Sequence, residues 1–336
     1  MSAFQVLALS GGGFRGLYTA EILARLESHL GEPLARRFDL ITGTSIGGIL
    51  ALALACEIPA ARMVELFEVE GENIFRRPSV ARILGWIPFY DRYLYGLFRA
   101  RHSADVLRRT LELPTIFGRE HLDQCIHPAI VTTVNFSTGN PRLFKTPHHA
   151  NFSQDYKQYL VDVALATSSA PVYFPHHVID DQIYVDGGLV ANGPALLGLH
   201  EAEIFFRRPP ESVRVLSIGT METNATASNA KSLNKGIVGW GKDLFTLTIA
   251  AQERLFNQML THRLGADRHM RIDTRLEKDQ ANDVGLDIVS HGAVRALKGQ
   301  AANSFQFSIN DSRLQEMLGH RPPPPIFHHG KRKNIS

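Results

Sequence analysis

The residue best suited to do chemistry is Ser45, at the centre of the sequence Gly-Thr-Ser-Ile-Gly at residues 43–47. An apolar run at residues 38–42 predicts a strand before it, and residues 46–55 predict a helix after it. A strand–Gly-x-Ser-x-Gly–helix turn makes one serine more exposed and more reactive than its neighbours. Gly43 and Gly47 leave room for the turn, and the helix places backbone N–H groups beside the hydroxyl. The pattern indicates a nucleophilic serine, although an incidental serine in a glycine-containing turn has the same five residues.

A second segment, near the N-terminus, offers groups that could bind negative charge. Residues 4–10 predict a buried strand, Gly11, Gly12 and Gly13 follow it directly, and residues 17–30 then predict a helix. Three glycines at a strand exit leave backbone N–H groups uncovered by side chains. Such a loop, running into a helix N-terminus, binds either a phosphate or the oxyanion that develops during acyl transfer.

The same loop satisfies the dinucleotide-binding pattern Gly-x-Gly-x-x-Gly through Gly11, Gly13 and Gly16. That fold needs an acidic residue at the end of the next strand to hold a ribose. Asp39 lies instead at the beginning of the next predicted strand. A nicotinamide- or flavin-dependent oxidoreductase is therefore the weaker interpretation. No Gly-Lys-Ser/Thr follows the glycines, so the pattern excludes a P-loop.

A third segment places a carboxylate beside residues that lack side chains. Residues 183–185 predict a short strand that leads into Asp186, Gly187 and Gly188. An aspartate in this position can approach another group closely. An ordinary Asp-Gly turn explains the same residues, so the segment becomes informative only beside the other two.

Together the three segments resemble the patatin-like phospholipase family. Residues 163–175 also resemble a stretch that lines the site in that family, and the resemblance covers about residues 4–220. It implies that Ser45 is the nucleophile and that Asp186 is its partner in a two-residue catalytic dyad. The oxyanion hole is expected from the backbone of Gly11, Gly12, Gly13 and Ile46. The remaining motif residues are expected to support these groups: Arg15, Gly16, Gly43, Gly47, Gly187 and Gly188.

The expected chemistry follows from the residue types. A serine hydroxyl is a poor nucleophile until a base takes its proton. Asp186 would be that base, and burial would raise its pKa and make it a stronger one. Attack on an ester carbonyl gives an acyl-serine, from which water releases a fatty acid. For Arg15 three roles stay open, namely holding the glycine loop, contacting a lipid phosphate or forming an ordinary ion pair.

A Ser-His-Asp triad is the chemical alternative. The chain has 15 histidines, and the order serine–acid–histidine found in α/β-hydrolases is available. Those enzymes place the nucleophile after several strands, whereas Ser45 follows only one predicted strand and its helix. The order of elements therefore favours the dyad. The histidines that come after Asp186 include His200, His262, His269 and His291.

The composition is that of a globular protein. The 336 residues are 44% hydrophobic and 21% charged, with a net charge of +3 that is compatible with an anionic membrane surface. With only two cysteines there is no disulfide framework, and we expect a cytoplasmic protein without a signal peptide or membrane span. Adjacent histidine pairs do not share a face, so no metal or other cofactor is expected. Scattered basic residues give no sign of a nucleic-acid polymer as partner.

The alternation of predicted strands and helices indicates an α/β fold, a three-layer α/β/α arrangement with a mostly parallel central sheet, as the patatin-like resemblance also implies. Ligands of such sheets bind at the carboxyl ends of the strands. Gly11, Ser45 and Asp186 each lie just beyond a predicted strand, so one crevice could hold all three. The catalytic core is expected at residues 1–220.

Three segments are predicted as additions to this core. Residues 76–101 mix aromatic residues with arginines and predict a cap, interpreted either as packed on the core or as a membrane-docking lid. Residues 221–307 predict a C-terminal helical extension packed on the core, with one short strand at residues 269–273. Residues 308–336 predict a partly disordered tail.

The size and layout resemble bacterial patatin-like effectors of cyclic-oligonucleotide antiphage signalling. That resemblance implies a cyclic dinucleotide activator, a membrane phospholipid substrate, peripheral contact with the inner face of the membrane, and a homo-oligomer. A constitutive housekeeping lipase is the alternative.

Overall fold

The computed structural model describes residues 3–76, 100–221, 237–276 and 284–333. In these residues eight strands form one sheet in the order β5-β6-β3-β2-β1-β7-β8, and β4 also pairs with β3. The strands are β1 Phe4–Leu9, β2 Leu40–Thr44, β3 Ala129–Asn135, β4 Asn140–Lys145, β5 His177–Ile179, β6 Gln182–Asp186, β7 Val213–Ile218 and β8 His269–Ile272.

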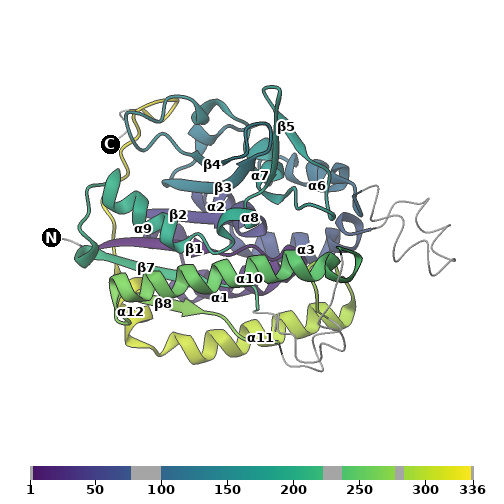
Figure 1. Ribbon diagram of the computed structural model, residues 1–336. Coiled ribbons are helices and arrows are strands. Elements are labelled where there is room, and N and C mark those ends of the chain that lie inside the picture. The colour runs from purple at the N-terminus through teal and green to yellow at the C-terminus, as the bar shows by residue number, and fades with distance from the viewer. Residues whose placement is uncertain (1–2, 77–99, 222–236, 277–283, 334–336) are drawn as a thin grey trace.

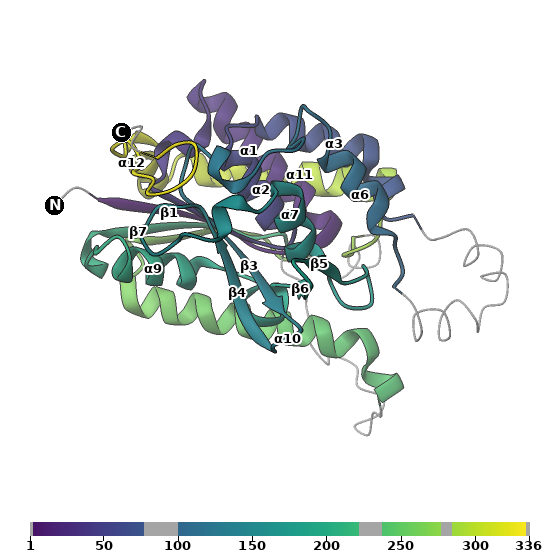
Figure 2. The same ribbon diagram turned by 90° about the horizontal axis from the view of Figure 1, so that it is seen from above.

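Helices cover both faces of this sheet (Figure 1). They are α1 Gly16–Leu30, α2 Ile46–Ala55, α3 Ala60–Ile74, α6 Ala104–Leu111, α7 Leu160–Ser168, α8 Gly188–Ala191, α9 Ala195–Ile204, α10 Ile237–Leu264, α11 His291–Ile309 and α12 Ser312–Gly319. Seen from above, α1, α2, α3 and α11 lie on one side of the sheet, and α9 and α10 lie on the other (Figure 2). The predicted three-layer α/β/α fold is confirmed.

The pairing of the strands matches a mostly parallel sheet. The pairs β1–β2, β1–β7, β2–β3 and β7–β8 are parallel, whereas β4, β5 and β6 form antiparallel pairs at one side. Side chains alternate across β1 as a strand requires. Leu7 and Leu9 contribute to the core under α1 and α2, while Val6 and Ala8 contribute to the core under α9.

Helix α2 runs through the centre of the larger core. All of its residues except Ile46 are buried, because its sequence is apolar or glycine on every face. It starts directly after Ser45. The position of that serine is therefore fixed by a strand on one side and by a fully packed helix on the other.

The C-terminal extension contains a strand, β8, at the place where the sequence predicts one. Strand β8 pairs in parallel with β7, so the extension widens the central sheet instead of only packing against it. Helix α11 packs along α1, and α10 crosses the opposite face over α8 and α9. The sequence of β8 is short and follows a long helix, which is why its membership of the sheet was not evident.

The described part of the tail contacts the core. Beyond α12 the backbone N–H of His328 donates to the Pro147 carbonyl (2.8 Å) and that of Lys331 to Asp123 Oδ2 (3.1 Å). Phe327 is buried. The proline-rich composition suggested disorder, but extended chain can still pack when its few apolar side chains find a site.

The predicted cap at residues 76–101 lies outside the described residues, apart from its two ends. Within the part of the chain that is described, no helix is both long and apolar enough to cross a bilayer.

Candidate active site

Ser45 occupies a strained turn between β2 and α2. Its φ of 55° and ψ of −128° lie in a region that favours glycine, and its side chain is almost fully buried. The two motif glycines make the turn possible. A Cβ on Gly43 would lie 2.1 Å from the carbonyl oxygen of Gly47, and one on Gly47 would lie 2.2 Å from that of Leu9. The strain thus falls on the serine, as in a nucleophile elbow.

The backbone of this turn is held by threonines of neighbouring elements. The N–H of Ser45 donates to Thr167 Oγ1 (2.8 Å), and that hydroxyl donates to the carbonyl of Thr132 (2.6 Å). The amide of Ser45 is therefore already used. The next amide, that of Ile46, belongs to the first turn of α2, where N–H groups have no partner within the helix.

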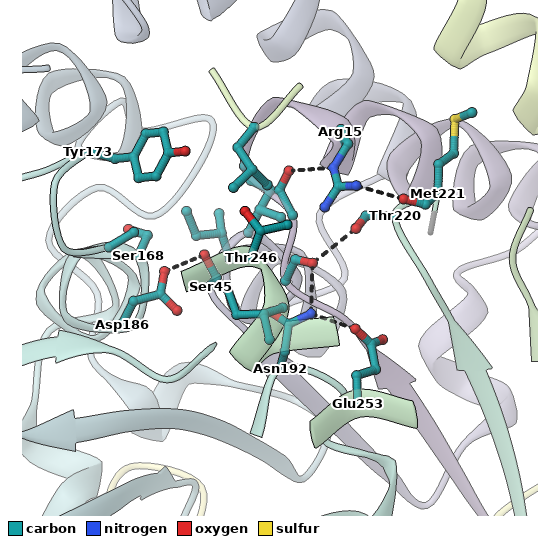
Figure 3. Close-up of a pocket in the computed structure, with 18 of the residues that line it drawn as sticks. Arg15, Ser45, Ser168, Tyr173, Asp186, Asn192, Thr220, Met221, Thr246 and Glu253 are labelled. Carbon is teal, nitrogen blue, oxygen red and sulfur yellow. Dashed lines mark hydrogen bonds between the residues drawn. The ribbon is translucent and has the colours of Figure 1, made fainter. Parts of the chain in front are cut away.

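Asp186 faces Ser45 at hydrogen-bond distance, as Figure 3 shows. Ser45 Oγ donates to Asp186 Oδ2 (2.7 Å), and the Gly188 N–H donates to Asp186 Oδ1 (2.7 Å). Asp186 is 3% exposed. Burial raises its pKa to about 6, although the hydrogen bonds from Ser45 and Gly188 oppose the shift.

The strand register explains how these two residues meet although β6 is antiparallel to β3. Thr44 at the end of β2 pairs with Thr132 of β3, and the next residue, Thr133, pairs with Asp186. Gly187 allows the chain to turn there, because a Cβ would lie 2.1 Å from the Thr132 carbonyl oxygen. The end of β6 thus reaches the carboxyl end of β2 across a single strand.

The glycine-rich loop lines the same cavity as Ser45 and Asp186. The carbonyl of Gly11 accepts from Asn192 Nδ2 (3.2 Å) and Thr220 Oγ1 (3.0 Å), and the carbonyl of Gly12 accepts from Arg15 Nε (3.4 Å). In a trans peptide the C=O and the following N–H point in opposite directions. These contacts therefore fix the directions of the N–H groups of Gly12 and Gly13. In the described chain neither N–H has a hydrogen-bond acceptor.

Gly11 is a correction to the expected oxyanion donors. Its N–H donates to the carbonyl of Asn192 (3.0 Å) and is not available to a ligand. Its lack of a side chain still matters, since a Cβ would lie 3.0 Å from that of Ser45. The expected donor set is thereby reduced to Gly12, Gly13 and Ile46.

Arg15 is buried and bound to main-chain oxygens. Besides the Gly12 carbonyl, its Nη1 donates to the carbonyl of Met221 (2.7 Å). Burial lowers its pKa, and the charges of Asp273 and Glu253 oppose that shift. The sequence left three roles open for Arg15, and these contacts agree with the one in which Arg15 holds the glycine-rich loop. Gly16 lets α1 pass close to the start of α2, since a Cβ at this position would lie 2.4 Å from Ile46 Cγ1.

The cavity has a volume of about 540 Å³ and two chemically different ends. One end is apolar and suits an acyl chain, with lining residues that include Ile49, Met63, Leu66, Phe67, Ile74, Phe75, Leu107, Leu111 and Phe174. The other end is polar and includes Arg15, Asn192, Thr220, Glu253, Asn257, Arg271 and Asp273. The described residues hold no cluster of three or more metal-ligating side chains.

The alternatives from the sequence find no support in this geometry. Among the described residues that line the cavity there is no histidine. His269, a candidate for a triad, instead contacts Ser217 Oγ (3.0 Å) and Thr261 Oγ1 (2.9 Å). Asp39, the candidate ribose ligand, accepts from the N–H of Gln5 (2.8 Å) before β2 begins, at the far end from the glycine loop.

Several residues of the site were missed by sequence reasoning. Among them are Asn192 and Thr220, which hold the Gly11 carbonyl, whereas Thr167, which holds the Ser45 amide, lies in the stretch at residues 163–175 that the resemblance places at the site. Thr220 follows β7 closely, so its place at the same sheet edge was a usable signal. Glu253, which contacts Asn192, lies in the middle of α10 and carries no motif.

An α/β sheet whose strained serine meets a buried carboxylate beside a glycine-rich loop has the architecture of a serine acyl hydrolase. The chain belongs to the patatin-like phospholipase family, whose sequence profile matches residues 7–199. By family it is a lipid acyl hydrolase.

Relatives extend this similarity over almost the whole chain. A cGAMP-activated phospholipase of Pseudomonas aeruginosa is 44% identical over 334 residues, which are 99% of this chain and 97% of the relative. A protein of the same description from Vibrio cholerae is 34% identical and covers 91% of this chain and 92% of the relative. Another, from Escherichia coli, is 34% identical with 91% and 90% covered.

The strain at position 45 predicts an unusual order of stability. Because glycine adopts the backbone angles of Ser45 without strain, Ser45→Gly should be more stable than Ser45→Ala by about 1–2 kcal/mol in denaturant unfolding. At the exposed helical residue Ser28 the order should be reversed by about 1 kcal/mol. Equal stabilities of the two variants at position 45 would show that the turn is unstrained.

Proposed function

We propose that this protein cleaves fatty acyl esters of membrane phospholipids through an acyl-serine intermediate, with Ser45 as nucleophile and Asp186 as base. The observation that supports it best is the 2.7 Å hydrogen bond between the two side chains. With a pKa near 6, Asp186 is ionised at neutral pH and is a stronger base than an ordinary aspartate.

In the first half of the reaction Ser45 Oγ attacks the ester carbonyl carbon while its proton passes to Asp186. The tetrahedral oxyanion then collapses, the ester C–O bond breaks, and the leaving alkoxide takes the proton from Asp186. In the second half water attacks the acyl-serine, gives its proton to Asp186, and the fatty acid leaves as Ser45 regains the proton. The same carboxylate thus acts as base and as acid in each half.

The oxyanion is proposed to accept hydrogen bonds from the amides of Gly12, Gly13 and Ile46. One such donor typically lowers the barrier by about 3–4 kcal/mol. The acyl chain is proposed to occupy the apolar end of the cavity, where Phe67, Leu107 and Leu111 lie.

We also propose that a cyclic dinucleotide activates this phospholipase. The support is that all three relatives reported above, each matched over at least nine-tenths of its length, are described as cGAMP-activated. A role in antiviral defence, an oligomeric active form and action at the inner face of the membrane belong to the same proposal. A constitutive lipase is the alternative.

Contact with the membrane is proposed to use the outer face of α10. Thr246, Ile249 and Glu253 on its inner face line the cavity, whereas five large apolar residues of the helix are exposed. Arg254, at the cavity, and Arg263, in an ion pair with Glu203 (3.1 Å), are exposed on the same helix, and cations beside an apolar face suit a bilayer that contains anionic phospholipid. The exposed apolar residues are Trp240, Leu244, Leu247, Leu255 and Met259.

The raised pKa of Asp186 predicts opposite effects of Asp186→Asn on activity and stability. In the unfolded chain this carboxyl has a pKa of about 3.9, so the folded state resists its ionisation. The penalty is absent below about pH 4, grows from there to pH 6, and is complete above pH 6. The neutral variant should therefore gain up to about 3 kcal/mol of unfolding free energy at pH 8 and almost none at pH 4. Its esterase activity should be lost.

For the unmodified enzyme, kcat/KM should fall about tenfold per pH unit below pH 6. Substituting any one of the histidines should leave this fall of kcat/KM below pH 6 unchanged. A histidine variant that folds but has lost activity, or an active Asp186→Asn variant, would exclude the dyad.

Nucleotide activation is tested by hydrolysis of a fluorogenic phospholipid in vesicles, with and without a panel of cyclic dinucleotides. We expect cGAMP to raise the rate at least tenfold, and Ser45→Ala to give no signal in either case. A basal rate equal to the stimulated rate, still abolished in Ser45→Ala, would establish the constitutive alternative.

Membrane docking is tested with the double variant Leu244→Ser, Leu255→Ser in co-sedimentation with phosphatidylglycerol vesicles. We expect several-fold weaker binding and unchanged hydrolysis of a soluble short-chain ester. Phe307→Ser is the matched control, because Phe307 is 87% exposed on α11, away from α10. Unchanged vesicle binding of the double variant, or a loss of self-association instead, would overturn this assignment of the surface.

A further inference from the structure

Two side chains of the C-terminal extension hold the contacts that orient the glycine-rich loop. Glu253 of α10 is the first. Its Oε2 accepts from Asn192 Nδ2 (2.7 Å), the same amide group that donates to the Gly11 carbonyl (3.2 Å). Its Oε1 accepts from Ser10 Oγ (2.6 Å), and Ser10 directly precedes the loop. Glu253 thereby connects α10 to the peptide that carries the Gly12 amide (Figure 3).

Asp273, which follows β8, is the second. Its Oδ1 accepts from the N–H of Met221 (3.0 Å). The carbonyl of Met221 accepts from Arg15 Nη1 (2.7 Å), and Arg15 Nε donates to the Gly12 carbonyl (3.4 Å). This second chain of contacts therefore ends on the peptide that carries the Gly13 amide.

Arg271 joins the two chains. Its Nη2 donates both to Glu253 Oε1 (2.8 Å) and to Asp273 Oδ2. Burial by itself would lower the pKa of Arg271, but the charges of Asp273 and Glu253 outweigh it and raise that pKa. The three side chains form one ion-paired group, which we call the extension clamp (Glu253, Arg271 and Asp273).

We propose that the extension clamp positions the amides of Gly12 and Gly13 for the oxyanion, which makes Glu253, Arg271 and Asp273 positioning residues of the proposed hydrolase reaction. The Gly11 carbonyl is tied to Glu253 through Asn192, and the Gly12 carbonyl is tied to Asp273 through Arg15 and Met221. A peptide whose carbonyl is released can rotate, and a hydrogen bond weakens steeply as its angle departs from linear. The inference rests on the proposed function, because it concerns the same oxyanion.

The same contacts give the extension a direct part in the chemistry. The loop lies between β1 and α1, more than 200 residues before the clamp. The contacts that hold its carbonyls on this side therefore come from residues distant in the sequence. The backbone also meets the extension at Leu286, whose carbonyl accepts from the N–H of Phe14 (2.9 Å). A core shortened at residue 220 should therefore lack a formed oxyanion hole.

The test uses Glu253→Gln in the full chain, with a soluble ester as substrate. We expect kcat to fall 10- to 100-fold with KM changed less than threefold, because the oxyanion exists only in the transition state. Affinity for a trifluoromethyl ketone, which forms a tetrahedral oxyanion on serine, should fall by the same factor as kcat/KM. The pH below which kcat/KM falls should stay near 6, because the variant leaves Asp186 and its hydrogen bonds unchanged.

Glu201→Gln is the matched control for a purely structural effect. Glu201 is fully buried on α9, binds Lys145 Nζ (2.6 Å) and His148 Nε2 (3.1 Å), and does not line the cavity. It should lower the melting temperature at least as much as Glu253→Gln and leave kcat within twofold. Arg271→Lys, which keeps a cation between the carboxylates, should lose less kcat than Arg271→Met.

A double-mutant cycle shows whether Glu253 acts through Asn192. If it does, Glu253→Gln should change kcat less than threefold in an Asn192→Ala background. Unchanged kcat in both Glu253→Gln and Arg271→Met would overturn the clamp, as would an equal kcat loss in Glu201→Gln. Should Glu253→Gln fail to fold, kcat of Arg271→Met gives the decision; should Arg271→Met fail to fold, Glu253→Gln and the cycle give it. Full activity in Ser45→Ala would instead remove the proposed function itself.

Discussion

The structure depends on a hydrogen bond between two groups that lie out of water. Ser45 Oγ and Asp186 Oδ2 are 2.7 Å apart, with the aspartate 3% exposed. To bring them together the end of β2 and the end of an antiparallel strand must meet across β3. Gly43, Gly47 and Gly187 lack the side chains that would prevent this approach. Burial, in turn, raises the pKa of the carboxyl and suits it to proton transfer at neutral pH.

Much of this site could be predicted from sequence, because its essential constraints are local. Gly43 is required by its close contact with the backbone of Gly47, four residues further on, and Gly13 is favoured by its own positive φ. The buried strands and the apolar helix α2 are equally local in origin. Patterns of glycine and apolar residues therefore predict the fold class and point to Ser45 as a candidate nucleophile, and the family resemblance adds Asp186 as its candidate partner.

The rest depends on contacts between distant segments, which leave no pattern in the chain. The sequence predicts the Gly11 N–H as an oxyanion donor, but in the structure this N–H donates to the carbonyl of Asn192. Glu253 is one charged residue among many, and only tertiary structure shows that it binds Asn192. The pairing of β8 with β7 and the packing of the tail were not predicted for a similar reason, since short or proline-rich segments are ordered here by the surfaces they meet. The sequence thus predicts the candidate reacting groups but not the contacts that hold them in place.

The most direct measurement is a crystal structure of the protein after reaction with a long-chain alkyl fluorophosphonate. In the adduct the phosphorus stands for the tetrahedral carbon and one of its oxygens for the oxyanion. We predict a covalent bond to Ser45 Oγ, the alkyl chain along Phe67 and Leu111, and that oxygen within about 3 Å of the amides of Gly12 and Gly13. Reaction of the fluorophosphonate with a different residue, or an adduct oxygen that points away from both amides, would contradict the account.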